Sequence, residues 1–565
     1  MIDNLPPGLI LILGALLVPF LRGKVQATWM LLLPAASLYQ LIQMPADHVQ
    51  TVTLLEYTLT WVEVDKMSLL FGYIFCIAAF IGVLYSFHLK DTVQNIAVLI
   101  YAGSALGAVF AGDLITLFLY WEGAAISSVF LIWARRTEKS YHAGMRYLIM
   151  QVASGVILLG GVLLYFRDTG SLDFGKMELG SMGTWLIFLG FGIKCAFPIL
   201  HTWLTDAYPE GTVTGMVFLS SFTTKLGIYA MARGFAGTEE LIWIGAVMTI
   251  FPIFYAVIEN DLRRVLAYSM INQIGFMVVG IGIGTDLAVN GAVAHAFADI
   301  LFKGLLLMTM GAILLRVGHV NASDLGALYK SMPVTTFFCL IGAASISAFP
   351  LFSAFITKSM VVTAAADGNY QVLWMILMFA SAGVLHHAGI KIPFYGFFGE
   401  DKGLRCKEAP INMLFAMAIA AIFCVGIGSF PSVLYGLLPF EVNYHPYDGT
   451  HIITQLQLLF FAILAFIVLK LKDIEPHEIP GTNIDFDWVY RKLGPLFWNG
   501  IYLPIIDQIT RFQENCKEWI PREFFGIKGG EKEMTVPRAM VTSTAALVIL
   551  MILLGYLVLD FYQAL

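Results

Sequence analysis

The feature that most constrains this chain is a long series of apolar runs, each long enough to cross a lipid bilayer as a helix. About sixteen such runs occupy the sequence, from residues 8–22 to residues 539–561, and short polar loops separate most of them. The composition agrees, because 58% of the residues are hydrophobic, only 13% are charged and the mean hydropathy is +0.78. We therefore expect an all-α polytopic membrane protein with about sixteen transmembrane helices rather than a soluble domain.

The charge balance and the cysteines exclude several classes of function. A formal net charge of −6 argues against nucleic-acid binding. The six cysteines are scattered, form no C-x-x-C pair and have no histidine at metal-ligand spacing, so small apolar packing residues are expected. The sequence also lacks a dinucleotide-binding glycine pattern, a phosphate-binding loop and an iron–sulfur cysteine set. We expect no cofactor and no metal, and no redox chemistry in this chain itself.

The loop charges predict how the helices are oriented. If the N-terminus lies outside, the inside loops collect most of the loop lysines and arginines, among them Arg135, Arg136, Arg263 and Arg264. The outside loops then hold few, such as Lys66. This asymmetry follows the positive-inside rule and places the N-terminus outside.

Charged side chains interrupt the apolar runs at a few positions, and each needs a reason because burying a charge in a membrane is costly. Glu122 lies inside the fifth run, and we expect it to be protonated or paired, with Lys194 of the seventh run as the natural partner. Lys225 lies about midway along the eighth run, which favours a buried lysine, and snorkelling to an interface is the alternative. Purely structural ion pairs are the alternative interpretation.

The eleventh run carries a titratable series. His295, Asp299 and Lys303 stand four residues apart and share one helical face. An acid between an imidazole and an amine suits a proton relay, although a self-neutralising structural ladder fits the same pattern. Lys391, in the thirteenth run, extends the relay or snorkels to the inner surface.

Two helices are predicted to be broken near a lysine. Pro198 follows Lys194 by four residues, and a short polar hinge with His201 and Asp206 comes next. Pro350 similarly precedes Lys358 in the twelfth run. Proline removes a helix hydrogen bond, and freed backbone groups at membrane depth need water or neighbours, so a hydrated cavity is expected beside each lysine.

The broken helices occupy corresponding positions in two groups of five spans. Five is an odd number, so tandem groups have opposite orientations in the membrane, as in inverted-repeat transporters. The predicted organisation is as follows: N-terminal helices in 1–94, a first five-helix repeat in 95–240, a second, inverted repeat in 241–400, C-terminal helices in 401–472, an amphipathic lateral segment in 473–538 and a final transmembrane helix in 539–565.

The lateral segment is predicted from spacing. Trp498, Ile501, Tyr502, Ile505 and Ile509 recur three and four residues apart, which is typical of an amphipathic helix. We expect it on the cytoplasmic side. An anchor at the lipid surface and a strut against a partner subunit are equally good interpretations.

These residues resemble the antiporter-like family shared by Mrp-type multisubunit Na⁺/H⁺ antiporters, respiratory complex I and membrane-bound hydrogenases. The similarity runs over roughly residues 60–440 and lies in five ordered motifs: Trp121–Glu122; Gly192 and Lys194 through Pro198, His201, Trp203, Leu204, Asp206 and Ala207; Lys225, Gly227, Tyr229 and Arg233; Asp261 to Ser269; and Pro350, Phe355 and Lys358.

The resemblance implies roles for single residues. Glu122 and Lys194 would form the pair that couples to proton movement, and Lys225 and Lys358 would carry protons onward. Lysine at position 358 looks more like the D-type Mrp subunit than like some complex I members. The resemblance also implies a bacterial cytoplasmic (inner) membrane, other membrane subunits as partners, and H⁺ with Na⁺ or another monovalent cation as the transported ions.

We therefore expect a subunit that moves protons through hydrated half-channels. A D-like subunit of a Mrp-type Na⁺/H⁺ antiporter is the first interpretation. A proton-pumping subunit of a complex I-like or hydrogenase complex, driven by redox chemistry in partner subunits, is the second. A structural assembly subunit with a vestigial charge axis is the third.

Overall fold

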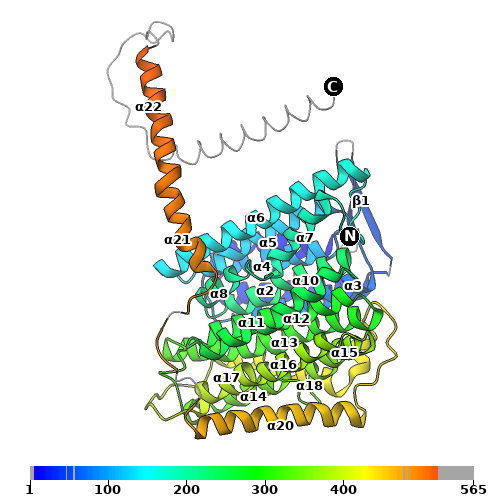
Figure 1. The fold of residues 1–565 in the computed structure, drawn as a ribbon, viewed down its shortest axis with the longest axis vertical. Helices are drawn as coiled ribbons and strands as arrows, with labels where there is room; N and C mark the ends of the chain where they lie inside the picture. The colour runs from blue at the N-terminus through cyan, green and yellow to red at the C-terminus, as the bar shows by residue number, and fades with distance from the viewer. Residues whose placement is uncertain (1–4, 46, 55–56, 475–477, 482, 520–565) are drawn as a thin grey trace. The chain divides into compact units, whose positions relative to one another are not determined.

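The computed structural model describes residues 5–45, 47–54, 57–474, 478–481 and 483–519. The chain divides into unit 1, Met1–Phe486, and unit 2, Asp487–Leu565, and each is described by itself. In unit 1 the helices lie side by side in one bundle, with α12 and α13 near its middle and α20 along one edge (Figure 1).

Unit 1 contains a first set of helices around a short hairpin and then two longer series. The first set is α1 (Pro7–Ala15), η2 (Val18–Phe20), α2 (Gly23–Gln43), β1 (Val49–Leu54), β2 (Tyr57–Glu63) and α3 (Lys66–Tyr85). The next series is α4 (Thr92–Val109), α5 (Leu114–Trp133), α6 (Glu138–Thr169), α7 (Met182–Lys194), α8 (Thr202–Ala207), η3 (Tyr208–Glu210), α9 (Gly215–Ser221) and α10 (Thr223–Phe235).

A second series and a C-terminal group complete unit 1. The second series is α11 (Glu239–Ile258), α12 (Leu262–Ile283), α13 (Asp286–Val317), η4 (Leu328–Lys330), α14 (Pro333–Ile346), α15 (Ser353–Asp367), α16 (Gln371–Val384), the π-helix η5 (Leu385–Ile390), α17 (Lys391–Pro393) and the π-helix η6 (Phe394–Phe398). The C-terminal group is α18 (Ile411–Ser429), α19 (Pro431–Tyr435) and α20 (Gly449–Leu471).

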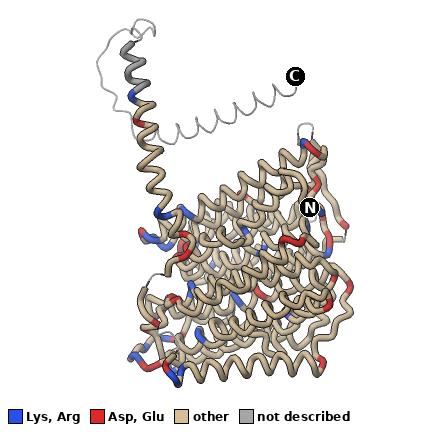
Figure 2. The backbone as a smooth tube through the Cα atoms, viewed as in Figure 1, with Lys and Arg blue, Asp and Glu red and all other residues tan. Residues whose placement is uncertain are grey.

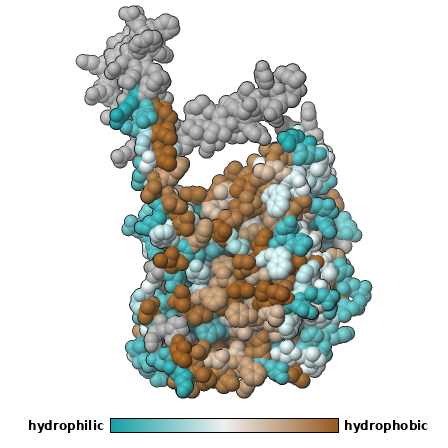
Figure 3. All heavy atoms as spheres, in the orientation of Figure 1, coloured by the Kyte–Doolittle hydropathy of each residue, from teal (hydrophilic) through white to brown (hydrophobic). Residues whose placement is uncertain are grey.

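The predicted membrane spans coincide with helices wherever the chain is described. Eleven described helices are long and apolar enough to cross a membrane, and three shorter apolar helices occur in Pro7–Phe20, Met182–Lys194 and Pro333–Ile346. The predicted last span, within 539–565, lies outside the described residues. Figure 2 shows charged residues concentrated at the left and right sides of the bundle, where the helices end. Figure 3 shows a broad hydrophobic band between these more hydrophilic sides, as a membrane protein requires.

One part of unit 1 contradicts the all-α expectation. β1 and β2 form an antiparallel hairpin in which Thr53 pairs with Thr58. The sequence from Tyr57 to Glu63 is rich in β-branched and aromatic residues, and Leu59 and Val62 are buried while Tyr57 and Thr58 are exposed. The segment is therefore a half-buried strand pair and not part of a helix.

The helix starts are fixed by polar side chains. An aspartate, serine or threonine precedes the first turn and accepts backbone N–H bonds that have no partner inside the helix. These capping residues are Asp65, Asp91, Asp113, Thr137, Ser181, Asp261, Thr285 and Asp448.

The two series match in several local features. α6 and α13 are both 32 residues long. The caps Asp113 and Asp261 each form an isolated antiparallel bridge, to Asp173 and Asn321, just beyond those long helices. Both the repeats predicted in 95–240 and 241–400 and their opposite orientation in a membrane stay predictions.

The breaks predicted at Pro198 and Pro350 have the same backbone conformation. The helix ends at Lys194 in one series and at Ile346 in the other, and a second helix starts several residues later. Ala196 and Ile199 have φ of 58° and 74°, and Ala348 and Leu351 have φ of 58° and 73°. Left-handed backbone costs a non-glycine residue roughly 1–2 kcal/mol. Such residues persist only where the surrounding structure holds them, so both breaks are defined parts of the fold.

Unit 2 contains α21 (Asp487–Phe497), the π-helix η7 (Trp498–Tyr502) and α22 (Leu503–Trp519). Trp498, Ile501, Ile505 and Ile509 are exposed, and Figure 3 shows brown and teal on opposite sides of this helix. These residues form a helix with an apolar and a polar side, and its role as a lateral helix stays a prediction. Its position on the cytoplasmic side stays a prediction.

The buried cap of α5 gives a first test of the fold. Asp113 is 2% exposed and accepts hydrogen bonds from the backbone N and the Oγ1 of Thr116, both at 2.7 Å. We expect Asp113→Ala to destabilise the solubilised protein by about 0.5–2 kcal/mol, seen as a lower thermal midpoint. Asp113→Asn keeps one acceptor oxygen and should fall between the two proteins. An alanine variant that melts with the wild type would contradict this role.

Candidate functional site

The buried charges predicted from the sequence lie on adjoining helices of unit 1. α7 contacts α10, α10 contacts α13, and α13 contacts α15. These four helices carry Lys194, Lys225, Asp299 with Lys303, and Lys358, in that order. The predicted charge row is therefore continuous from helix to helix, and every one of its lysines is buried.

At the first end of the row, Lys194 is the last residue of α7 and is completely buried. Its ammonium donates a hydrogen bond of 2.9 Å to the carbonyl of Trp121 and lies 4.2 Å from the centre of the Trp121 ring. A cation over an indole face is attracted by the ring quadrupole. Trp121, in the predicted Trp–Glu motif, is thus the direct partner of this lysine.

Glu122 does not form the expected ion pair. No contact of 4 Å or less joins its carboxylate to Lys194, two residues that the structure describes in full, because the Lys194 amine is held by the neighbouring Trp121. The Oε1 atom of Glu122 is buried without a hydrogen-bond partner. It lies against Gly155 of α6, where an added Cβ would come within 1.6 Å of it. The carboxylate therefore occupies a space that only glycine leaves open.

The centre of the row is an ion pair between two helices. The Nζ of Lys225 lies 2.6 Å from the Oδ2 of Asp299, and both side chains are 0% exposed. Lys225 also donates to the carbonyl of Ser220, at 3.0 Å, just before the kink between α9 and α10. Snorkelling is therefore excluded for Lys225. Asp299 pairs with this lysine of α10 and not with its predicted neighbours on α13.

The titratable residues of α13 each contact a different partner. His295 contacts the hydroxyl of Thr357 at 2.9 Å through Nδ1 and the amide oxygen of Gln273 at 3.1 Å through Nε2. Lys303 donates to the hydroxyl of Ser269 at 2.7 Å. One helical face is shared, as predicted, but each group is held by a neighbouring helix.

Lys358 ends the row on the second broken helix. Its ammonium donates to the carbonyl of Ile346, at 3.0 Å, which is the last residue before the break that contains Pro350. It also lies 5.2 Å from the centre of the Phe276 ring. Lys194 and Lys358 therefore share one arrangement: a backbone carbonyl, an aromatic face and a broken helix.

Two further predicted residues meet a segment that follows α20. We name this segment the C-terminal strap; it comprises residues 478–481 and 483–486. Lys391 is 1% exposed, donates to the carbonyl oxygens of Val257 and Glu259, and forms an ion pair of 2.7 Å with Glu478 of the strap. Snorkelling is therefore excluded for Lys391 as well.

The strap also reaches the first broken helix. The Nε2 of His201 lies 3.1 Å from an oxygen of Asp485, which accepts a further hydrogen bond of 2.8 Å from Tyr268. Burial acts to raise the pKa of the Asp485 carboxyl, but the hydrogen bonds from His201 and Tyr268 hold that pKa below its ordinary value. Asp206, the other polar residue of the hinge, forms a two-pronged pair with Arg146 at 2.7 and 3.1 Å.

The sequence alone does not indicate several of the residues that contact the predicted site. Glu478 and Asp485 belong to a segment assigned to the lateral region, and Gly155 is one glycine among 52. Only the acidic character of the strap could have indicated a role beside basic groups. Among the residues that the structure describes, no cluster of three or more histidine, cysteine or acidic side chains could hold a metal ion.

A row of lysines with carbonyl, hydroxyl and single carboxylate partners can hold and release protons. Broken helices around a row of buried charges are the arrangement found in membrane proteins that move ions. Residues 111–383 match the family described as NADH:quinone oxidoreductase/Mrp antiporter, TM. The resemblance to this antiporter-like family that the motifs predict is confirmed by this match.

The relatives come from more than one kind of complex. The chain is 29% identical over 485 residues to the A-type component of the Na⁺/H⁺ antiporter of Alkalihalophilus pseudofirmus, covering 74% of this chain and 60% of the relative. It is 30% identical over 345 residues to hydrogenase-4 component B of Escherichia coli, covering 54% and 51%. The chain thus spans a little over half the length of these relatives.

The fold is also that of a solved protein. A chain in the structure of the Mrp complex from Dietzia sp. DQ12-45-1b superposes with a TM-score of 0.77 at 21% identity. The superposition covers 96% of this chain and 66% of that one. At this identity the likeness concerns the fold alone.

The space beside Glu122 is testable. We expect Gly155→Ala to lower the thermal midpoint of the solubilised protein, because the new methyl group would overlap the carboxylate. Gly160→Ala on the same helix is the matched control, since nothing lies within 4 Å of its Cβ. Adding Glu122→Ala should relieve the effect of Gly155→Ala. Strict additivity of the two changes would contradict the contact.

The central ion pair gives a second test. Asp299→Ala leaves the Lys225 ammonium buried without a carboxylate, which costs about 3–5 kcal/mol. Lys225→Met together with Asp299→Ala removes the unpaired charge, so the double variant should unfold at a higher temperature than Asp299→Ala alone. Asp286→Ala, in the exposed first turn of the same helix, is the control and should be neutral. Equal melting of all the variants would show that the pair contributes nothing.

Proposed function

We propose that this chain moves protons through the membrane along the buried row from Glu122 and Lys194 to Lys358, as a subunit of a Mrp-type monovalent cation/proton antiporter. The observation that carries the proposal is the completely buried Lys225–Asp299 pair, at 2.6 Å, between lysines whose hydrogen bonds go to backbone carbonyls. Buried charges of this kind are costly, and ion handling is their commonest use.

The mechanism follows from the electrostatics of the row. Two unit charges about 4–10 Å apart interact by roughly 2–4 kcal/mol at an effective dielectric constant near 20. When Lys194 gains or loses a proton, it changes the field at Lys225 and so the strength of the bond to Asp299. When the pair with Asp299 weakens, the Lys225 amine moves toward Lys303 and His295. The resulting change in charge then alters the field at Lys358.

The broken helices supply water at the two ends of this row. Each break frees backbone groups, and each lies next to a lysine that a backbone carbonyl holds. We place one half-channel at His201 and Asp206 and the other at Pro350. The transported ions are H⁺ and Na⁺ or another monovalent cation, and other membrane subunits are the partners.

We also propose that the chain is a D-like subunit. Lys358, on the second broken helix, favours a D-like subunit. The antiporter relative from Alkalihalophilus pseudofirmus is of the A type, so the assignment depends on this residue and not on that relative.

A redox-driven pump is the second candidate, because a hydrogenase component is 30% identical to the chain over 345 residues. In that case the same row would move protons when partner subunits transfer electrons. A structural subunit with a vestigial charge axis is the third.

Proton exchange in everted vesicles that contain the whole complex separates these candidates. We expect Na⁺ or another cation to collapse a pH gradient with the wild type, and Lys194→Ala to abolish this. Lys176→Ala, at an exposed loop lysine, is the control and should behave as wild type.

The other outcomes select the alternatives. Proton uptake that depends on Lys194 and follows only from an electron donor would identify a redox-driven pump. A Lys194→Ala variant that equals the wild type in both assays would leave only the structural role.

A further inference from the structure

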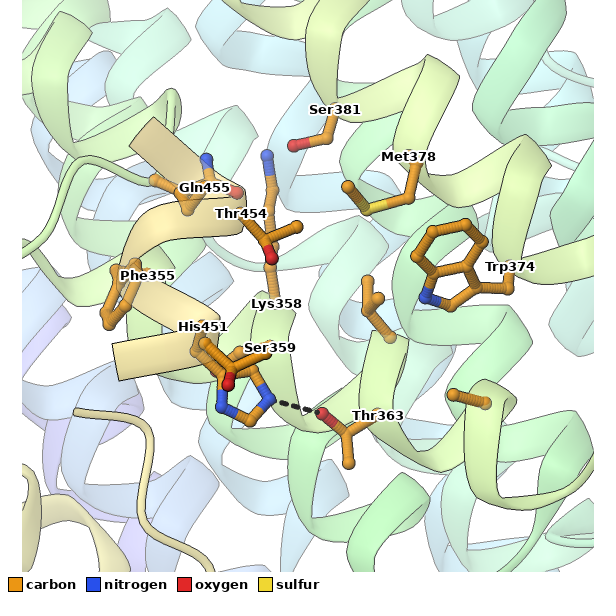
Figure 4. Close-up of a pocket in the computed structure, with 14 residues that line it drawn as sticks. Phe355, Lys358, Ser359, Thr363, Trp374, Met378, Ser381, His451, Thr454 and Gln455 are labelled. Carbon is orange, nitrogen blue, oxygen red and sulfur yellow. Dashed lines mark hydrogen bonds between the residues drawn. The ribbon is translucent and has the colours of Figure 1, made fainter. Parts of the chain in front are cut away.

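A cavity of about 250 Å³ adjoins Lys358 between α15, α16 and α20 (Figure 4). Its walls differ in character. Most of the lining surface is apolar, from residues such as Phe355 of α15 and Trp374 and Met378 of α16, and polar groups are contributed by Lys358, Ser359 and Thr363 of α15 and His451 of α20. At the ~30 Å³ that a water molecule occupies in the liquid, this volume holds several waters. We call it the Lys358 chamber.

One end of the chamber is the ammonium of Lys358. The side chain extends from α15 between Gln455 and Ser381 (Figure 4). Its only hydrogen bond among the described residues goes to the carbonyl of Ile346. Gln455 donates to the carbonyl of Ser347, at 3.2 Å, and so ties α20 to the break beside this lysine.

The other end of the chamber is His451, in the first turn of α20. Its Nε2 lies 3.3 Å from the hydroxyl of Thr363, a residue of the chamber wall. Its Nδ1 lies 2.8 Å from the carboxylate of Asp448, the cap of α20. The side chains of His451 and Asp448 are 31% and 51% exposed. The imidazole therefore has one nitrogen toward the chamber and one toward a carboxylate at the surface.

We propose that the Lys358 chamber is a hydrated proton passage and that His451 exchanges protons between it and the surface at Asp448. The proposal rests on the proposed function of the row. Lys358 gives one proton to a chamber water, and that water passes a proton to Nε2 of His451. The imidazole then releases the proton on Nδ1 toward Asp448, so that one proton enters and one leaves. Histidine suits this exchange because its two nitrogens can gain and lose protons near neutral pH.

A proton that crosses the chamber must move along α15. The backbone positions of Lys358 and Thr363 are five residues apart, about 7.5 Å along the helix axis. The Lys358 amine points away from His451 (Figure 4), so the transfer needs intervening waters. Ser359 lies between Lys358 and Thr363 on α15 and offers a hydroxyl to the same wall.

His451→Ala in the vesicle assay tests the exchange. We expect a loss of proton movement of about tenfold or more, since a positioned proton-transfer group commonly contributes 10²-fold or more. Imidazole added to the solution at the Asp448 side should restore part of the rate by replacing the missing ring. His445→Ala, an exposed histidine of the loop before α20, is the matched control and should be unchanged.

Water in the chamber is tested independently of transport by Ser359→Cys. A membrane-impermeant cationic thiosulfonate should label this cysteine in intact vesicles, whereas Cys424, completely buried in the unsubstituted chain, should not react. Labelling from one side only also identifies the face of the membrane to which the chamber opens.

The alternative occupant is a lipid chain, given the apolar residues of α16. Labelling of Ser359→Cys by a lipophilic maleimide but not by the cationic reagent would overturn the proposal. If the wild type moves protons and His451→Ala does so equally well, only the chamber proposal fails. If the wild type moves none under either driving force, the function proposed for the row fails and the chamber proposal fails with it.

Discussion

The structure of this protein depends on the fact that a charge buried away from water must find a partner. Lys225 and Asp299 neutralise each other at the middle of a row whose other lysines, Lys194, Lys303 and Lys358, donate to carbonyl or hydroxyl oxygens. Such a pair fixes the rotation of α10 against α13, because either helix turned away would leave its charge alone. The same constraint makes the pair responsive, since any change of charge nearby alters its strength.

The two broken helices show how a membrane bundle places a lysine beside an open backbone. Each break contains two left-handed residues between the end of one helix and the start of the next, and a lysine of the broken helix donates to a backbone carbonyl. The lysine comes from the broken helix itself in both cases, but Lys194 precedes its break and Lys358 follows its own. The two ends of the row are therefore similar without being identical.

The sequence predicts the helices well because apolar runs and capping residues are local signals. It also identifies the lysines, since a charge within an apolar run stands out. It does not predict partners: Asp299 bonds Lys225 rather than its own helical neighbours, and Trp121 rather than Glu122 holds Lys194. Partner choice depends on how helices rotate against one another, which no spacing along one helix reveals. The hairpin at β1 and β2 escapes prediction for a different reason, because its alternation is short and lies between long apolar runs.

The C-terminal strap has a consequence for how the protein is made. Asp485 completes the hydrogen bonding at Nε2 of His201, nearly three hundred residues earlier, and Glu478 brings a carboxylate to Lys391. A ribosome delivers the helices that carry these basic groups long before it delivers the strap. The nascent bundle must therefore form in the membrane before the Asp485 carboxylate reaches the hinge histidine and before the Glu478 carboxylate reaches Lys391. Synthesis that stops after α20 would yield every helix of the bundle and leave that electrostatic assembly unfinished.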